Sequence, residues 1–99
     1  MTLHTKLVSL PIHFREASKS DLPEILRLHA QPEMDDGQVL SVTDAEQVLD
    51  RMASYPDYKL YVAIRDDHIV GTLALLIMDN LGHQGAPSGV IEDVVVDPR

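Results

Sequence analysis

The stretch of sequence that decides the fold is Val90-Ile91-Glu92-Asp93-Val94-Val95-Val96-Asp97-Pro98-Arg99. β-Branched residues crowd it, and proline cannot donate to a strand's hydrogen-bond ladder, so it predicts a β-strand that ends before Pro98. Two carboxylates, Glu92 and Asp93, interrupt the apolar run. A buried strand rarely carries charges without a partner, so these two acids are candidates for a functional role.

Two further strands are predicted before this one. Apolar and polar side chains alternate over residues 60–65, and residues 69–78 form a long apolar run. A Gly/Pro-rich loop over residues 79–89 separates the second of these strands from the final one. Three consecutive strands favour an antiparallel meander. Because residues 69–78 are apolar on both faces, we expect both faces of the sheet to be covered.

The N-terminal part predicts one strand and two helices. Residues 1–11 read as a flexible lead-in and residues 12–17 as a strand. Apolar residues recur at helical spacing over residues 22–30 and again between Thr43 and Pro56. Each helix is expected to begin at a capping box, formed by Asp21 with Glu24 and by Thr43 with Glu46. The predicted order is β-α-α-β-β-β in one α+β domain.

Composition excludes several classes of function. Sixteen acidic residues against eight basic ones give a formal charge of −8, which disfavours binding to nucleic acid and mildly favours a cationic substrate. There is no cysteine, and the five histidines show no spacing typical of a metal site. No apolar run reaches membrane-spanning length. We therefore expect a cytoplasmic protein without a metal, nucleic-acid or membrane partner.

In this order the predicted elements resemble the N-terminal half of the GNAT superfamily of acetyl-CoA-dependent N-acetyltransferases. The resemblance covers roughly residues 12–99. It is carried by Phe14-Arg15-Glu16-Ala17 with Ser20-Asp21-Leu22-Pro23, by Tyr61-Val62-Ala63, by Ile69-Val70-Gly71-Thr72 and by Ile91-Glu92-Asp93-Val94-Val95-Val96-Asp97-Pro98.

The resemblance implies a fold, a cofactor and a boundary. The fold is a mixed, mostly antiparallel sheet, the acetyl donor is acetyl-CoA, and the acceptor is the primary amine of a small molecule. The family's glycine-rich motif for the cofactor pyrophosphate should begin at or just after Arg99, which makes Arg99 a cofactor-binding candidate. We therefore expect residues 1–99 to be the N-terminal part of one acetyltransferase domain, inactive alone and lacking the C-terminal half.

Within the superfamily, the chain is similar to glucosamine-6-phosphate N-acetyltransferases. They carry an Ile-Glu-Asp stretch like Ile91-Glu92-Asp93, preceded nine residues earlier by a histidine that corresponds to His83. This similarity implies that Asp93 and His83 contact the substrate, with His83 meeting an anionic group. The alternative is that His83 is a solvent-exposed loop residue.

Acetyl transfer to an amine needs a group that removes the amine's proton and a donor for the developing oxyanion. Glu92 and Asp93 are consecutive in the predicted strand, so we expect them to point to opposite faces and not to do the same job. We favour Glu92 as the base, direct or through water, or as the amine anchor. Both acids could instead form salt bridges or reach solvent. The acidic Asp35-Asp36-Gly37 loop reads as a solvated turn, although the resemblance implies that loops in this region line the acceptor cleft.

The resemblance also places the pantetheine arm of the cofactor along Val94, Val95 and Val96, which would bind it through their backbone. As side chains these valines are predicted core. The apolar final strand is expected to lie at a sheet edge and to promote association, so we expect a homodimer. A different class of function remains open: a non-catalytic GNAT-like half domain that binds a partner through this edge.

Overall fold

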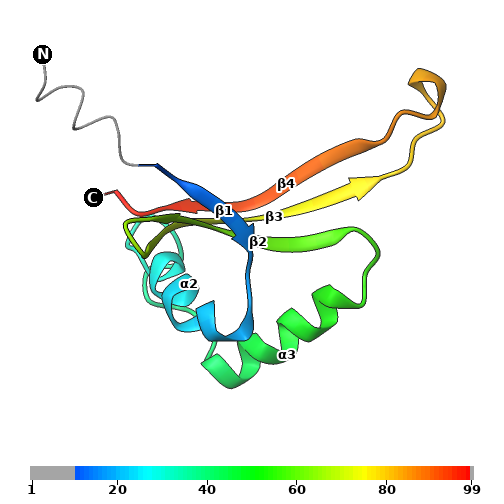
Figure 1. The fold of residues 1–99 in the computed structure, drawn as a ribbon. Helices are drawn as coiled ribbons and strands as arrows, with labels where there is room; N and C mark the ends of the chain where they lie inside the picture. Colours follow the sequence, from blue (N-terminus) through cyan, green and yellow to red (C-terminus); the bar gives the residue numbers. More distant parts are fainter. Residues whose placement is uncertain (1–10, 99) are drawn as a thin grey trace, which may run out of the picture.

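A computed structural model describes residues 11–98 (Figure 1). The expected lead-in, apart from Pro11, and Arg99 lie outside the described residues. The elements are β1 (His13–Glu16), η1 (Lys19–Asp21), α2 (Leu22–His29), α3 (Val42–Ala53), β2 (Tyr58–Arg65), β3 (His68–Met78), η2 (His83–Gly85) and β4 (Ser88–Val96). The short 3₁₀ turns η1 and η2 aside, this is the predicted order of strands and helices.

The strands form one sheet in the order β1-β2-β3-β4, and every neighbouring pair is antiparallel. The predicted meander and the α+β fold class are therefore confirmed. Both helices lie against the same face of the sheet, and β3 and β4 extend beyond them as a long hairpin (Figure 1). β1 and β4 are the two edges of this sheet, as the sequence predicts for the final strand.

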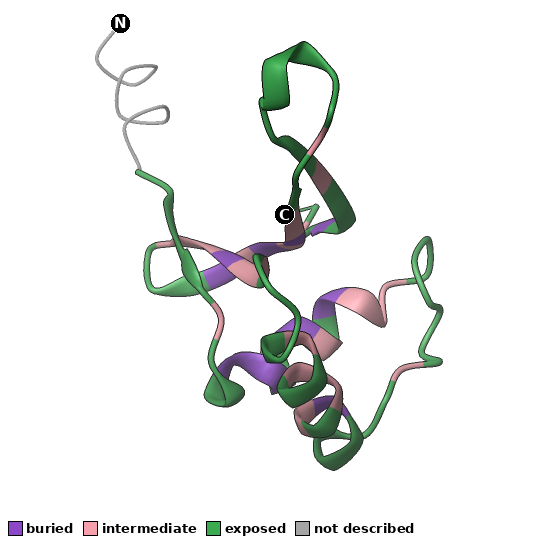
Figure 2. Ribbon diagram, turned by 90° about the vertical axis from the view of Figure 1, so that its right-hand side faces the viewer, coloured by how far each residue is buried: buried purple, intermediate pink, exposed green. Residues whose placement is uncertain are grey.

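The core fills the space between the helices and the sheet. Its most deeply buried side chains are Leu28 of α2, Val62 of β2 and Val95 of β4. Leu22 and Ile25 of α2 complete the contact with the sheet, because they lie on the same side of that helix as Leu28. Figure 2 shows buried segments gathered where the sheet meets α2, while the tip of the β3–β4 hairpin is exposed.

Neither predicted capping box forms, although Asp21 does occupy the predicted N-cap position of α2. The side chain of Ser41 accepts a hydrogen bond of 3.1 Å from the Asp44 N–H and caps α3. Asp21 makes no side-chain cap for α2. Its carboxylate turns back instead, accepting bonds from the Arg15 guanidinium at 2.7 and 2.9 Å and from the Ser18 N–H at 2.8 Å. This contact fastens the β1–α2 connection to the sheet.

Asp21 is buried, and its hydrogen bonds to Arg15 lower its pKa to about 2. A depressed folded-state pKa stabilises the protein above about pH 4, and this stabilisation is lost as the pH falls towards 2. We expect Asp21→Asn to cost about 2 kcal/mol of unfolding free energy at pH 7, from a shift of roughly two pKa units. Urea unfolding of the intact protein at pH 7, 5 and 3 measures the difference.

Asp50→Asn is the matched control, because the Lys19–Asp50 ion pair of 3.2 Å is exposed on both sides. Exposed pairs contribute little, so this variant should lose no more than about 0.5 kcal/mol. Equal losses in the two variants, or a loss in Asp21→Asn that does not shrink as the pH falls, would contradict the assignment.

The second face of the sheet carries no helix within residues 11–98, so the predicted cover of both faces is found on one face only. Phe14 of β1 and Val94 and Val96 of β4 line an apolar hollow of about 290 Å³ on this face. Their exposed fractions are 67%, 53% and 64%. A large apolar area therefore meets solvent in the described part of the chain.

Candidate active site

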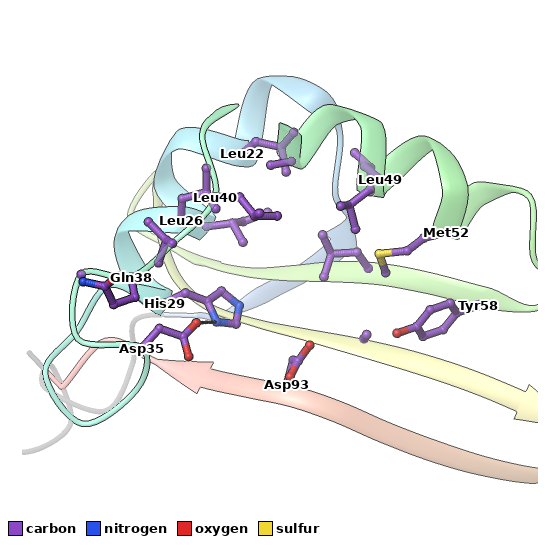
Figure 3. A pocket seen from close by; sticks show the side chains of 17 residues that line it. Leu22, Leu26, His29, Asp35, Gln38, Leu40, Leu49, Met52, Tyr58 and Asp93 are labelled. Carbon is purple, nitrogen blue, oxygen red and sulfur yellow. Dashed lines mark ion pairs between the residues drawn. The ribbon is translucent and has the colours of Figure 1, made fainter. Parts of the chain in front are cut away.

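The candidate site is a cavity of about 620 Å³ between the two helices and the sheet (Figure 3). Aliphatic side chains from α2, α3 and β2 supply most of its wall. The segment that joins α2 to α3 closes one side through residues 37–40. Its volume lies within the range of small-molecule sites, roughly 300–1,000 Å³. The polar side chains that reach it are those of His29, Asp35, Gln38, Tyr58 and Asp93.

A β-bulge in β4 directs Asp93 into this cavity. Ala74 of β3 pairs with Glu92 and Thr72 pairs with Val95, so β4 has one residue more than β3 in the same interval. Asp93 takes up the extra residue with a φ of 52°, in the left-handed region that aspartate tolerates better than most residues. Figure 3 shows its carboxylate rising from β4 towards the side chains of the helices.

The prediction that Glu92 and Asp93 point to opposite faces is wrong, because it assumed a regular strand. Glu92 pairs with Ala74, which lines the cavity, so both acids lie on the helix-covered side of the sheet. Both residues are exposed, and they differ in that Asp93 lines the cavity whereas Glu92 does not. The two acids are therefore neighbours in β4 and lie on the same side of the sheet.

The other acid of the cavity is already engaged. Asp35 lies 3.7 Å from His29 Nδ1, a contact that becomes an ion pair when the histidine is protonated. The Asp93 side chain is exposed at the cavity, its carboxylate has no hydrogen-bond or ion-pair partner among residues 11–98, and no lysine or arginine lines the cavity. The cavity therefore offers an unpaired carboxylate to a cationic ligand.

The edge of β4 presents backbone groups next to this cavity. The Asp97 N–H donates to the Val70 carbonyl of β3 at 2.8 Å. Because N–H groups alternate along an antiparallel strand, that of Val96 points away from β3, whereas the bulge interrupts this alternation at Val94. The Val96 carbonyl accepts a bond of 3.2 Å from the Gln31 side chain, consistent with this direction. Of the three valines predicted as core, Val95 is buried at 1% exposure, but Val94 and Val96 face the helix-free side of the sheet and are exposed, so the prediction is wrong for these two.

His83 lies away from these residues. It belongs to η2 at the tip of the β3–β4 hairpin, which projects beyond the helices (Figure 1). It is exposed and does not line the cavity. The described chain thus brings Glu92, Asp93 and the edge of Val94–Val96 together, and leaves His83 apart. Arg99, the remaining predicted site residue, lies outside the described residues.

No group of three or more histidine, aspartate or glutamate side chains could hold a metal ion within residues 11–98. None of the helices described in the structure is long and apolar enough to cross a membrane.

A comparison with models of known protein families shows the family to which the chain belongs. The model of the acetyltransferase (GNAT) family matches residues 22–99. The chain belongs to the GNAT acetyltransferase family. GNAT enzymes use acetyl-CoA as donor, and the resemblance seen in the sequence is confirmed. A comparison with curated proteins finds no match.

Solved GNAT structures share the fold. A putative acetyltransferase from Agrobacterium tumefaciens is 30% identical, with a TM-score of 0.74, and the match covers 87% of this chain and 59% of that one. The glucosamine-6-phosphate N-acetyltransferase from Arabidopsis thaliana is 22% identical, with a TM-score of 0.72, 90% of this chain and 62% of that one being covered. The chain therefore spans less than two thirds of the length of either structure.

For two residues that line the cavity, His29 and Asp35, the sequence contains little indication of a place in the site. His29 lies on the apolar face of α2 and reads as a packed core histidine, whereas it meets Asp35 at the cavity. Asp35 sits in a loop that reads as solvated, and only the family resemblance pointed to a substrate role for that loop. In the sequence, only the presence of His29 shortly before the acidic Asp35-Asp36-Gly37 loop indicated that the two could meet.

Proposed function

We propose that the intact protein transfers an acetyl group from acetyl-CoA to the primary amine of a small molecule, and that residues 11–98 supply its acceptor cavity and its β4 strand. The observation that carries the proposal is the unpaired Asp93 carboxylate in a cavity beside the open edge of β4. An amine enters protonated at neutral pH, since its pKa is around 10, and a carboxylate attracts it. We also propose that the intact protein is located in the cytoplasm and forms a homodimer.

The residues present fit the donor. Acetyl-CoA supplies an activated thioester, and its pantetheine arm carries amides that can pair with an open strand edge. Val96 presents an outward N–H group at that edge, and Val94 and Val95 are proposed as further backbone contacts. A backbone N–H placed at the acetyl carbonyl would stabilise the developing oxyanion by about 3 kcal/mol. Arg99 is proposed as a further contact to the cofactor.

We assign different parts to the two acids. Asp93, which lines the cavity, anchors the ammonium group. Glu92, exposed beside it, accepts the amine proton through water and can release it to solvent. The neutral nitrogen would then form a bond to the acetyl carbon, the carbon–sulfur bond would break, and the second proton of the nitrogen would pass, directly or through water, to the leaving thiolate. The products are the N-acetylated amine and free CoA.

A thioester-consumption screen tests the proposal. The intact protein is incubated with acetyl-CoA and with amino sugars, polyamines, amino acids, alkylamines and peptides in turn. We expect release of free thiol that depends on one class of amine, with the acetylated product identified by mass spectrometry. Absence of amine-dependent release across the panel would contradict the proposed function.

A phosphorylated amino sugar is the alternative acceptor, suggested by the Ile91-Glu92-Asp93 stretch and by His83. If His83 meets the phosphate, His83→Ala should raise the KM for glucosamine-6-phosphate at least about tenfold and change that for glucosamine little, because a charge-assisted bond is lost only with the phosphate. Steady-state kinetics with both sugars measure this difference. An equal effect on the two would leave His83 as a loop residue.

A further inference from the structure

We infer that the amine acceptor is an apolar one, a primary alkyl- or arylalkylamine without an anionic group. The inference rests on the proposed acetyl transfer and narrows its substrate class. It follows from three properties of the Asp93 cavity, namely its wall, its charge and its access.

The wall of the cavity is aliphatic over most of its area. Leu22 and Leu26 of α2 and Leu49 and Met52 of α3 face the sheet across the cavity (Figure 3). A sugar ring would place several hydroxyl groups against these side chains, and a hydroxyl buried without a partner costs free energy. A hydrocarbon body gains free energy from the same contacts.

The charged side chains of the cavity favour a ligand that carries one positive charge and no negative charge. Its formal charges come from Asp93 and from Asp35, and Asp35 already faces His29 at 3.7 Å. A phosphate group would lie near two carboxylates without any lysine or arginine, and so would be repelled and left unpaired. A polyamine would bring a second ammonium group into an aliphatic wall. A ligand with one ammonium group, bound at Asp93, and a hydrocarbon body against the aliphatic wall matches the charged and apolar side chains of the cavity.

The access route is also apolar. Leu40 lines the cavity from the segment between α2 and α3 and is 48% exposed. An exposed leucine at the mouth of a cavity loses its contact with water when a hydrocarbon group lies on it. Leu40 is therefore the position at which the substrate preference can be tested with little effect on folding.

The first test compares acceptors with the intact protein and acetyl-CoA. We expect kcat/KM to rise about three- to fourfold per added methylene from ethylamine to hexylamine, and to be at least tenfold higher for 2-phenylethylamine than for glucosamine-6-phosphate, glucosamine or spermidine. An equal or higher value for a sugar or for spermidine would overturn the inference and leave acetyl transfer intact. No turnover of any amine would overturn the proposed function as well.

The second test uses matched variants. Leu40→Ser should lower kcat/KM for 2-phenylethylamine about three- to tenfold and change that for ethylamine little, whereas Leu81→Ser, at a fully exposed leucine of the hairpin loop, should change neither. Asp93→Asn should raise the KM for both amines at least about tenfold, and Asp79→Asn, an exposed control outside the cavity, should not. A Leu40→Ser variant that affects both amines equally, or not at all, would overturn the inference.

Discussion

Glu92→Gln should lower kcat for amine acetylation by about 10²–10⁴-fold, the range expected when a positioned base is removed. Glutamine keeps the size of the side chain and cannot accept the proton. Because Glu92 is exposed in β4, the substitution should leave folding unchanged. KM for the amine should change little, since Asp93 supplies the anchor, and affinity for acetyl-CoA should also persist, since backbone groups of β4 would hold it.

Steady-state kinetics over pH 6–10 provide the measurement. The loss in Glu92→Gln should shrink as the pH rises towards the amine's own pKa near 10, because a growing fraction of the amine is then already neutral. Glu16→Gln is the matched control, since Glu16 is exposed on β1, at the opposite edge of the sheet. Turnover in Glu92→Gln equal to that of the control would remove Glu92 from the mechanism.

The polypeptide of residues 1–99 by itself should associate rather than remain a monomer. Its helix-free sheet face exposes Phe14, Val94 and Val96, and β4 is an edge strand with outward N–H groups. Apolar area of this kind and an unpaired edge both favour contact with a second chain. We expect dimers or larger species at tens of micromolar, and a homodimer of the intact protein is proposed on the same ground.

Light scattering on this 99-residue polypeptide measures its mass in solution. Phe14→Glu should shift the population towards the monomer, because it places a charge in the apolar hollow, and its 67% exposure makes the change tolerable for folding. Leu81→Glu, in the hairpin loop, should leave association unchanged. A monodisperse and cooperatively folding monomer without any substitution would contradict the account of this face.

The fold could be predicted because local signals and global topology agree. Alternation over residues 60–65, the apolar run of residues 69–78 and helical spacing in α2 and α3 each gave the correct element within a few residues. Cap assignments failed because serine, threonine and aspartate are all good caps, and several stand close together near each helix start. At the start of α2, the Asp21 side chain pairs with Arg15 of β1 and does not cap the helix. Arg15 precedes Asp21 by a turn of the chain, so the spacing of residues within the helix does not reveal this pair.

The position of the candidate site in the fold could be predicted in part. The strand that carries it was identified, since two acids in an apolar run are unusual. The β-bulge was not, because the sequence around Asp93 contains neither glycine nor proline to mark it. Without the bulge, alternation assigns Glu92 and Asp93 to opposite faces. The cavity side chains of α2 and of the following loop depend on tertiary packing, and spacing along the sequence does not reveal it.

The central claim is that Asp93 and the β4 edge serve acetyl transfer from acetyl-CoA to an amine. The most direct test is to incubate the intact protein with acetyl-CoA and 2-phenylethylamine and to follow free thiol and N-acetylated product together by mass spectrometry. The account predicts equal amounts of the two products, with formation slowed by Glu92→Gln and by Asp93→Asn and unaffected by Asp79→Asn. Thiol release without any acetylated amine, for this acceptor and for the rest of the panel, would contradict it.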